Sequence, residues 1–135
     1  MATNPHFQRA VRNSALDLIN TALGASAIIN LYAGAQPADV SAATTAANVV
    51  VATPEFTQSS AFAAASAGVL TANAITSEAT AVGGSANWFS FCKSTGQRVV
   101  DGSVGTSDAD LILNSQSIAT GASVAISAFT ITFAA

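Results

Sequence analysis

The chain has 135 residues, which suits one domain with a sizeable core. Only 8% of its residues are charged, 50% are hydrophobic and the net charge is −3. An ordinary soluble domain is about 25% charged, so we expect an Ala-, Ser-, Thr- and Asn-rich surface that other protein largely covers. The four cations are split between two segments, which argues against binding to nucleic acid or to anionic lipid: Arg9, Arg12, Lys93 and Arg98.

The sequence shows neither a signal peptide nor a membrane-spanning segment, and it contains one cysteine. Residues 1–7 lack the charged and apolar regions of a signal peptide. No stretch reaches the roughly 18 consecutive apolar residues of a membrane-spanning helix. Cys92 is the single cysteine and follows an apolar run, which is typical of a buried, inert thiol. We therefore expect a soluble protein that is made in a reducing compartment and has no membrane anchor.

The N-terminal segment predicts a helix. Asn4 followed by Pro5 is typical of an N-cap with proline at the first helical position, and Gly24 is placed as a C-terminal cap. Residues 1–13 form either the start of this helix or an arm, and residues 14–135 form a single β-rich domain with a leading helix. Apolar residues recur at helical spacing at Phe7, Val11, Ala15, Leu18 and Ala22, flanked by Leu16, Ile19 and Leu23, and the polar side carries Gln8, Arg12, Asn13, Asp17 and Asn20.

The pattern after Gly24 changes to that of short strands. Residues 27–32 and 48–52 predict strands, and the Ala-, Ser- and Thr-rich residues 35–48 predict a surface loop between them. Residues 56–65 and 69–75 predict a pair of weak strands. Their alanine content leaves a helix as the alternative.

The strongest strand pattern begins at Trp88. Residues 88–93 and 97–101 flank a short connection that contains Gly96, which predicts a β-hairpin. Bulky side chains on both faces indicate that the first of these strands is central and covered on both sides. Asp101-Gly102, residues 105–110 and residues 119–121 predict turns, and residues 111–113 predict a short strand.

The C-terminal tail changes its alternation. Apolar residues stand at even positions up to Ile126 and at odd positions from Phe129, so a β-bulge near residues 127–128 would keep one common face. The alternative is two separate strands with a kink between them. The predicted fold class is mainly β, a small β-sandwich or jelly-roll-like domain with one N-terminal α-helix. Its expected core anchors are Trp88, Phe89, Phe91, Phe129, Ile131 and Phe133.

Few residues are available for catalysis. Nothing places His6, the single histidine, beside a nucleophile. Glu55 and Glu78 lack the neighbouring aromatic residues that line sugar sites, so we interpret them as solvated turn residues. Asp101, Asp108 and Asp110 do not fit the spacing of an EF-hand. They either bind calcium in another geometry or cap tight turns by hydrogen bonds to the backbone. The sequence predicts no enzyme and no cofactor.

One segment resembles a known family. Residues 101–114, Asp-Gly-Ser-Val-Gly-Thr-Ser-Asp-Ala-Asp-Leu-Ile-Leu-Asn, followed by residues 126–132, look like small structural proteins of tailed bacteriophages. Residues 13–17, 31–39 and 87–89 fit in order. Such proteins are similar to head decoration (cement) proteins, which bind the outside of the icosahedral shell, often as trimers. The resemblance implies a virion protein of the head exterior, made in the host cytoplasm, that binds the major capsid protein and itself but neither nucleic acid nor membrane.

The resemblance directs attention to the N-terminus. Pro5, His6 and Phe7 are the candidate arm that reaches a neighbouring subunit, because chain termini become ordered when they dock. Two other virion roles stay open, a neck or tail connector and a displayed host- or glycan-binding module. The binding module needs an exposed aromatic or carboxylate patch, so the exposure of Trp88 distinguishes it from the structural roles.

Overall fold

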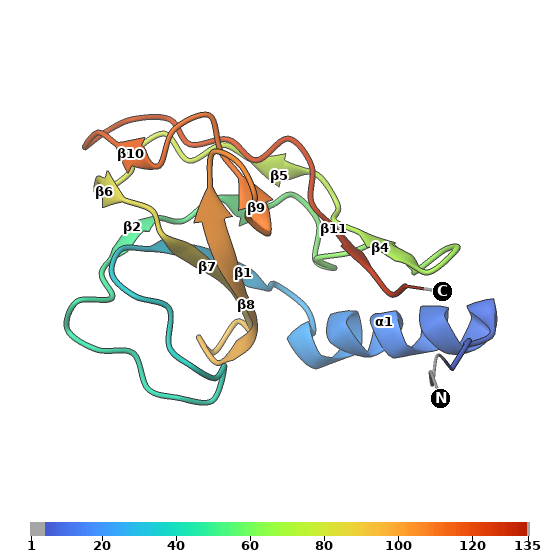
Figure 1. Ribbon diagram of the computed structural model, residues 1–135. Coiled ribbons are helices and arrows are strands. Elements are labelled where there is room, and N and C mark those ends of the chain that lie inside the picture. The colour runs from blue at the N-terminus through green and yellow to red at the C-terminus, as the bar shows by residue number, and fades with distance from the viewer. Residues whose placement is uncertain (1–4, 135) are drawn as a thin grey trace.

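The computed structural model describes residues 5–134. Within them the chain forms helix α1 (Arg9–Leu23) followed by eleven short strands (Figure 1). The strands are β1 (Ile28–Tyr32), β2 (Val50–Ala52), β3 (Glu55–Phe56), β4 (Val69–Thr71), β5 (Ile75–Thr76), β6 (Gly84–Ser85), β7 (Trp88–Cys92), β8 (Arg98–Gly105), β9 (Leu111–Ile112), β10 (Ser117–Ile118) and β11 (Thr130–Thr132). The predicted class, a mainly β domain with one N-terminal helix, is confirmed.

Seven strands form one curled sheet in the order β5-β3-β1-β7-β8-β9, with β2 paired to β1. Strand β7 is central, because it pairs antiparallel with β1 on one side and with β8 on the other. All five of its residues are buried, as predicted. The β7–β8 pair is the predicted hairpin, and β9 lies parallel to the end of β8.

The core lies against one face of this sheet. Phe89 and Phe91 project from β7 into a cluster of aromatic rings, in which Phe129 lies 4.9 Å from Phe91 and 5.3 Å from Phe89 between ring centroids. Phe62 lies 5.6 Å from Phe91. All four side chains are buried, and apolar residues from α1, β1, β2 and β4 surround them.

Gly102 lies inside β8 directly opposite Phe89, so the predicted turn at Asp101-Gly102 is wrong. A Cβ atom at this position would come within 2.5 Å of the Phe89 ring. Glycine therefore stands here because the ring fills the space of a side chain, not because the chain turns.

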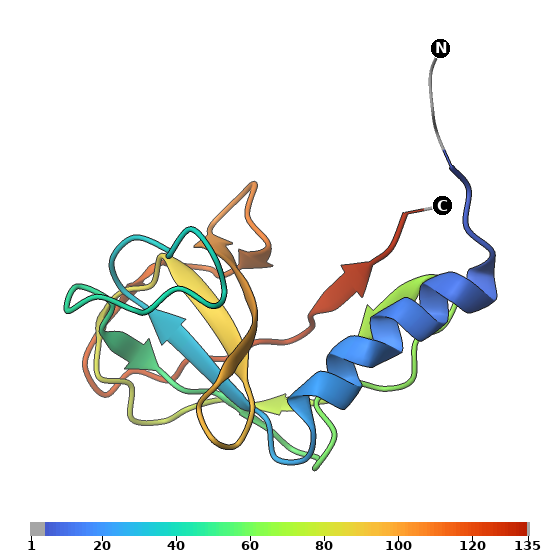
Figure 2. The same ribbon diagram turned by 90° about the horizontal axis from the view of Figure 1, so that it is seen from below.

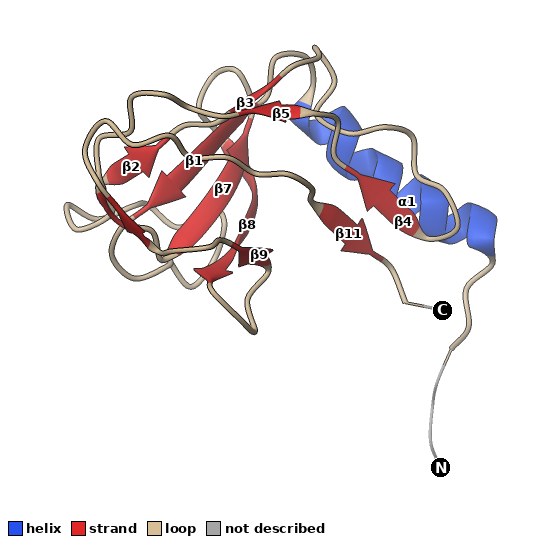
Figure 3. Ribbon diagram, turned by 90° about the horizontal axis from the view of Figure 1, so that it is seen from above, coloured by secondary structure: helices blue, strands red, loops and turns tan. Residues whose placement is uncertain are grey.

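A second, smaller layer extends from the curled sheet. Strands β4 and β11 pair antiparallel, from Thr71 with Thr130 to Val69 with Thr132. They lie alongside α1 and away from β1, β7 and β8 (Figures 2 and 3). Leu16 and Leu23 of α1 are buried in the core that this layer shares with the sheet.

The helix begins later than predicted. Gln8 is the N-cap, with non-helical φ and ψ of −55° and 146°, and residues 5–7 precede the helix. Pro5 is thus not the first helical residue, and Asn4 lies outside the described residues. Gly24 does end the helix, at φ 69°, and its N–H donates to the Asn20 carbonyl.

The tail does not contain the predicted β-bulge. Val124 forms an isolated bridge with Glu78, whereas β11 begins at Thr130 and pairs with β4. The two halves of the tail therefore belong to different parts of the fold, which is closer to the alternative of separate strands. The helix considered for residues 56–65 and 69–75 does not form. The strand predicted at residues 56–65 is wrong as well, because only Phe56 belongs to a strand, β3, and Ser60 and Phe62 form isolated bridges. Residues 69–75 contain β4 and the start of β5.

Candidate functional site

The polar side of α1 faces the protein, not the solvent. Its amide and carboxylate groups bind backbone N–H groups of the connection between β3 and β4, which would otherwise lack partners. The groups belong to Asn13, Asp17 and Asn20, whose spacing of three and four residues places them on one side of the helix. The bonds run from the Gly68 N–H to Asn13 Oδ1 (2.8 Å), from the Ala65 N–H to Asp17 Oδ1 (2.7 Å) and from the Phe62 N–H to Asn20 Oδ1 (3.2 Å).

The opposite side of α1 is therefore left exposed and apolar. Val11 is 51% exposed and Leu18 is 66% exposed. With Ala10, Ser14 and Ala15 they line a shallow hollow of about 480 Å³, and we call these five residues the outer α1 face. The set contains no charged residue. Figure 2 shows α1 in front of β4. The side of α1 that bonds to Ala65 and Gly68, next to β4, is the one opposite this face.

The candidate arm lies next to this helix. Pro5, His6 and Phe7 are exposed, and the Phe7 ring packs edge-on against Phe133 with 5.7 Å between centroids. Phe133 was expected in the core but is 38% exposed, because β11 directs it beyond the end of the sheet toward Phe7. Ile131 is half-buried, whereas Trp88, Phe89, Phe91 and Phe129 are buried.

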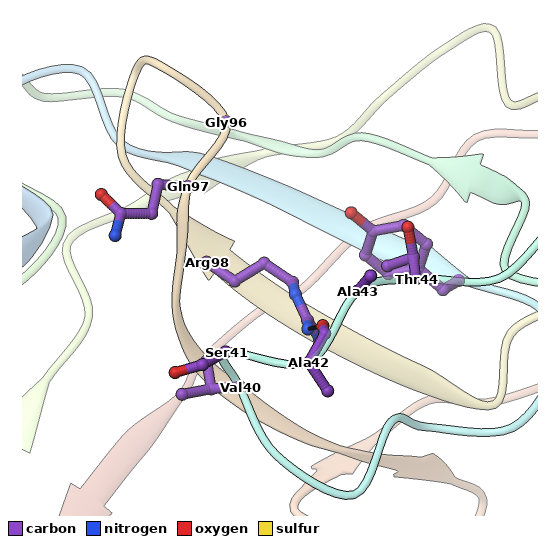
Figure 4. A pocket seen from close by; sticks show the side chains of 9 residues that line it. Val40, Ser41, Ala42, Ala43, Thr44, Gly96, Gln97 and Arg98 are labelled. Atoms are coloured by element: carbon purple, nitrogen blue, oxygen red, sulfur yellow. Dashed lines mark hydrogen bonds between the residues drawn. The ribbon is translucent and has the colours of Figure 1, made fainter.

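A second candidate site lies on the other face of the curled sheet. The connection from residue 35 to residue 48 forms no strand, as the sequence predicted. It passes over this face, where Arg98 of β8 bonds to it. A pocket of about 380 Å³ lies beneath it, lined by Tyr32, residues 40–44 and residues 96–98. Figure 4 shows the Arg98 side chain extending toward Ala42, whereas Gln97 points the opposite way.

Arg98 is already fully engaged in this pocket. It forms an ion pair with Asp101 and donates hydrogen bonds to the carbonyls of Asp39 and Ala42. Its guanidinium carbon lies 5.3 Å from the centre of the Trp88 ring. Because its charge is neutralised, this pocket offers no free cation to an anionic ligand.

Trp88 is completely buried under this loop. Tyr32 stacks on it with 4.1 Å between ring centroids and an angle of 10° between the rings. The residue that would distinguish a sugar-binding platform is therefore not available at the surface.

The carboxylates singled out from the sequence have separate partners. Asp101 pairs with Arg98, and Asp110 accepts hydrogen bonds from the N–H and hydroxyl of Ser103 at 2.8 Å. Glu78 accepts a hydrogen bond from the Thr53 N–H, and Glu55, Asp108 and His6 are exposed. In residues 5–134 no three His, Cys, Asp or Glu side chains gather as metal ligands. No helix in this range has the length and hydropathy to cross a membrane.

The Cys92 thiol should be inert in the folded protein. It is buried 3.4 Å from the Ser90 hydroxyl, and burial raises its pKa. We expect negligible reaction with Ellman's reagent under native conditions and full reaction in urea. Rapid native labelling would contradict the buried position.

The same thiol makes stability depend on pH. The folded state holds the Cys92 proton more tightly than the unfolded chain, so the free energy of unfolding should fall as the pH rises above about 8.5, the ordinary thiol value. Cys92→Ala should remove this part of the decline. Burial also raises the pKa of Tyr32, which adds a separate decline above about pH 10.

The outer α1 face is the stronger of the two candidate sites. It exposes apolar side chains that nothing in the described chain covers, whereas the charged group of the pocket beneath residues 35–48, the Arg98 guanidinium, already bonds to groups of the chain itself. No protein-family model, curated protein or solved structure matches this chain.

Proposed function

We propose that this chain is a decoration (cement) protein of a tailed-bacteriophage head. It binds the outside of the icosahedral shell, as a trimer, and stabilises contacts between major capsid protein subunits. The observation that carries the proposal is the exposed apolar surface of Phe7, Val11 and Leu18 on a chain with very few charges. Exposed apolar side chains that gather on one face, as Val11 and Leu18 do, mark contact with other protein.

The segment that carries the family resemblance has a scaffolding role in this fold. It runs from β8 through a bend into β9, and Asp110 holds the bend by bonding back to Ser103. Its residues are used by the protein's own backbone rather than presented to a substrate. This use agrees with a structural role and supports the proposal that the chain is not an enzyme.

Shell binding needs no chemistry beyond surface burial. Each subunit would gain about 25 cal/mol for every Å² of apolar surface that it buries against the capsid. Repetition over the shell multiplies this gain, and DNA pressure from inside makes it useful. Residues 5–7 are exposed next to α1 and remain our candidate for the capsid contact.

Phe7→Ala should lower the occupancy of shells assembled without this chain. Complete burial of a phenylalanine side chain contributes about 1.5–3 kcal/mol, and Phe7 has about half of its surface left to bury, so we expect roughly 3- to 10-fold weaker binding. Val49→Ala is the matched control, because Val49 is 52% exposed and Phe7 is 46% exposed. Equal occupancy for both variants, measured by quantitative gel analysis of purified shells, would remove residues 5–7 from the contact.

The location of the chain in the virion tests the function itself. A cryo-EM reconstruction of the particle should show knobs of this fold, in groups of three, across the outside of the head. Density at a single vertex or on the tail would mean a connector and would overturn the shell-stabilising role. Density on a fibre tip would favour a host-binding module instead.

A further inference from the structure

We infer that the outer α1 face binds the same face of another copy of this chain. From the proposed function the inference takes only the expected number of copies, three. The face itself is defined by the structure, and its self-association can be measured without any shell.

The shape of the outer α1 face suits contact with itself. Val11 and Leu18 protrude, and the hollow that they border is lined by the small side chains of Ala10, Ser14 and Ala15. One patch therefore presents both the projecting side chains and the hollow that receives them. Helices that associate side by side, in pairs or in threes, use such an arrangement of knobs and holes.

The charges of α1 also favour an identical partner. Asp17 binds the Ala65 N–H, and Arg12 donates to the Phe133 carbonyl, so both are directed toward β4 and β11. Arg9 lies about 160° around the helix from Val11. Two copies of the outer α1 face therefore meet without like-charge repulsion, whereas a charged partner would find no complementary group on it.

The size of the face sets the expected strength. A helix of this length extends about 22 Å, and one side of it is smaller than the roughly 800 Å² per partner of a standard stable interface. We therefore expect reversible, concentration-dependent association in solution. Surfaces next to the outer α1 face would strengthen this association once copies of the chain are held side by side.

The test is sedimentation velocity on the full chain, from low-micromolar to near-millimolar concentrations. We expect the wild type to associate, and Val11→Lys/Leu18→Lys to weaken the association constant by about 100-fold or more, because each new cation must be buried beside its own copy. Val82→Lys/Ile112→Lys is the matched control, since these side chains are 60% and 53% exposed elsewhere on the surface. The urea midpoint of each variant shows whether it is folded.

A cross-linking experiment locates the contact directly. Ser14→Cys places a thiol within the outer α1 face, and the native Cys92 is buried and does not interfere. Oxidation should join chains at this position but not in Ser94→Cys, whose thiol lies in the exposed turn between β7 and β8.

The outcomes separate this inference from the proposed function. A wild type that stays monomeric, or lysine and control variants that associate equally, would overturn the inference. Either result would leave shell binding to be decided by the location of the chain in the virion. Association that requires the outer α1 face, in a chain found only on the tail, would retain the inference and overturn the cement role.

Discussion

Phe91→Ala is expected to destabilise the protein by about 3–5 kcal/mol, the usual cost of removing a buried aromatic side chain. Phe91 lies at the centre of the core, with its ring centroid between 4.9 Å and 5.7 Å from those of Phe56, Phe62, Phe89 and Phe129. The surrounding rings come from β3, from β7 itself and from two separate connections, so they cannot all close over the cavity. Urea unfolding followed by circular dichroism measures the loss.

Phe133→Ala is the matched control for this substitution. It makes the same chemical change at a ring that is 38% exposed and contacts only Phe7 among the aromatic residues described. Its cost should be about 1 kcal/mol. A Phe91→Ala variant that is no less stable than Phe133→Ala would mean that the aromatic cluster is not the main core.

The central strands of the curled sheet were predictable because their signals are local. The aromatic residues of β7 and the glycine-containing connection to β8 identify a central hairpin without any tertiary information. The β-bulge was wrong for a non-local reason. The change of alternation near residue 127 is real, but it marks the point at which the tail leaves Glu78 and joins β4.

The orientation of α1 was not predictable from its apolar pattern. A surface helix ordinarily turns its apolar stripe to the core, and here Val11 and Leu18 of that stripe face solvent. The connection before β4 presents backbone N–H groups that need acceptors, and Asn13, Asp17 and Asn20 supply them. Their shared three- and four-residue spacing was the available signal, but the backbone groups that they satisfy lie about 50 residues away along the chain.

The pocket beneath residues 35–48 was hidden from sequence analysis for the same reason. Arg98 and Asp101 are visible as neighbours in the chain, but their role depends on a loop that crosses above them. A cation in a predicted hairpin is ordinarily solvated. Here its side chain is only 9% exposed and that of Asp101 is 5% exposed.

Arg98→Ala is the second substitution with a large expected effect. It leaves the Asp101 carboxylate buried without its partner, and breaking a buried ion pair in this way costs about 3–5 kcal/mol. The double variant Arg98→Met/Asp101→Leu removes both charges and should recover much of that loss. Lys93→Ala, the same charge change in the same hairpin, should cost about 0.5 kcal/mol or less. Urea unfolding of the wild type and the three variants measures these differences in the free energy of unfolding.

The same substitution should also loosen the loop above the pocket. Arg98 joins β8 to the carbonyls of Asp39 and Ala42, so its removal frees this part of the loop and admits solvent to Trp88. Trp88 fluorescence should move to longer wavelength and become quenchable by iodide in Arg98→Ala, but not in Lys93→Ala. If Arg98→Ala is destabilised while Trp88 stays protected, the ion pair stabilises the sheet alone and the loop is held by its other contacts, such as Asn48 with the Ala35 carbonyl at 2.7 Å.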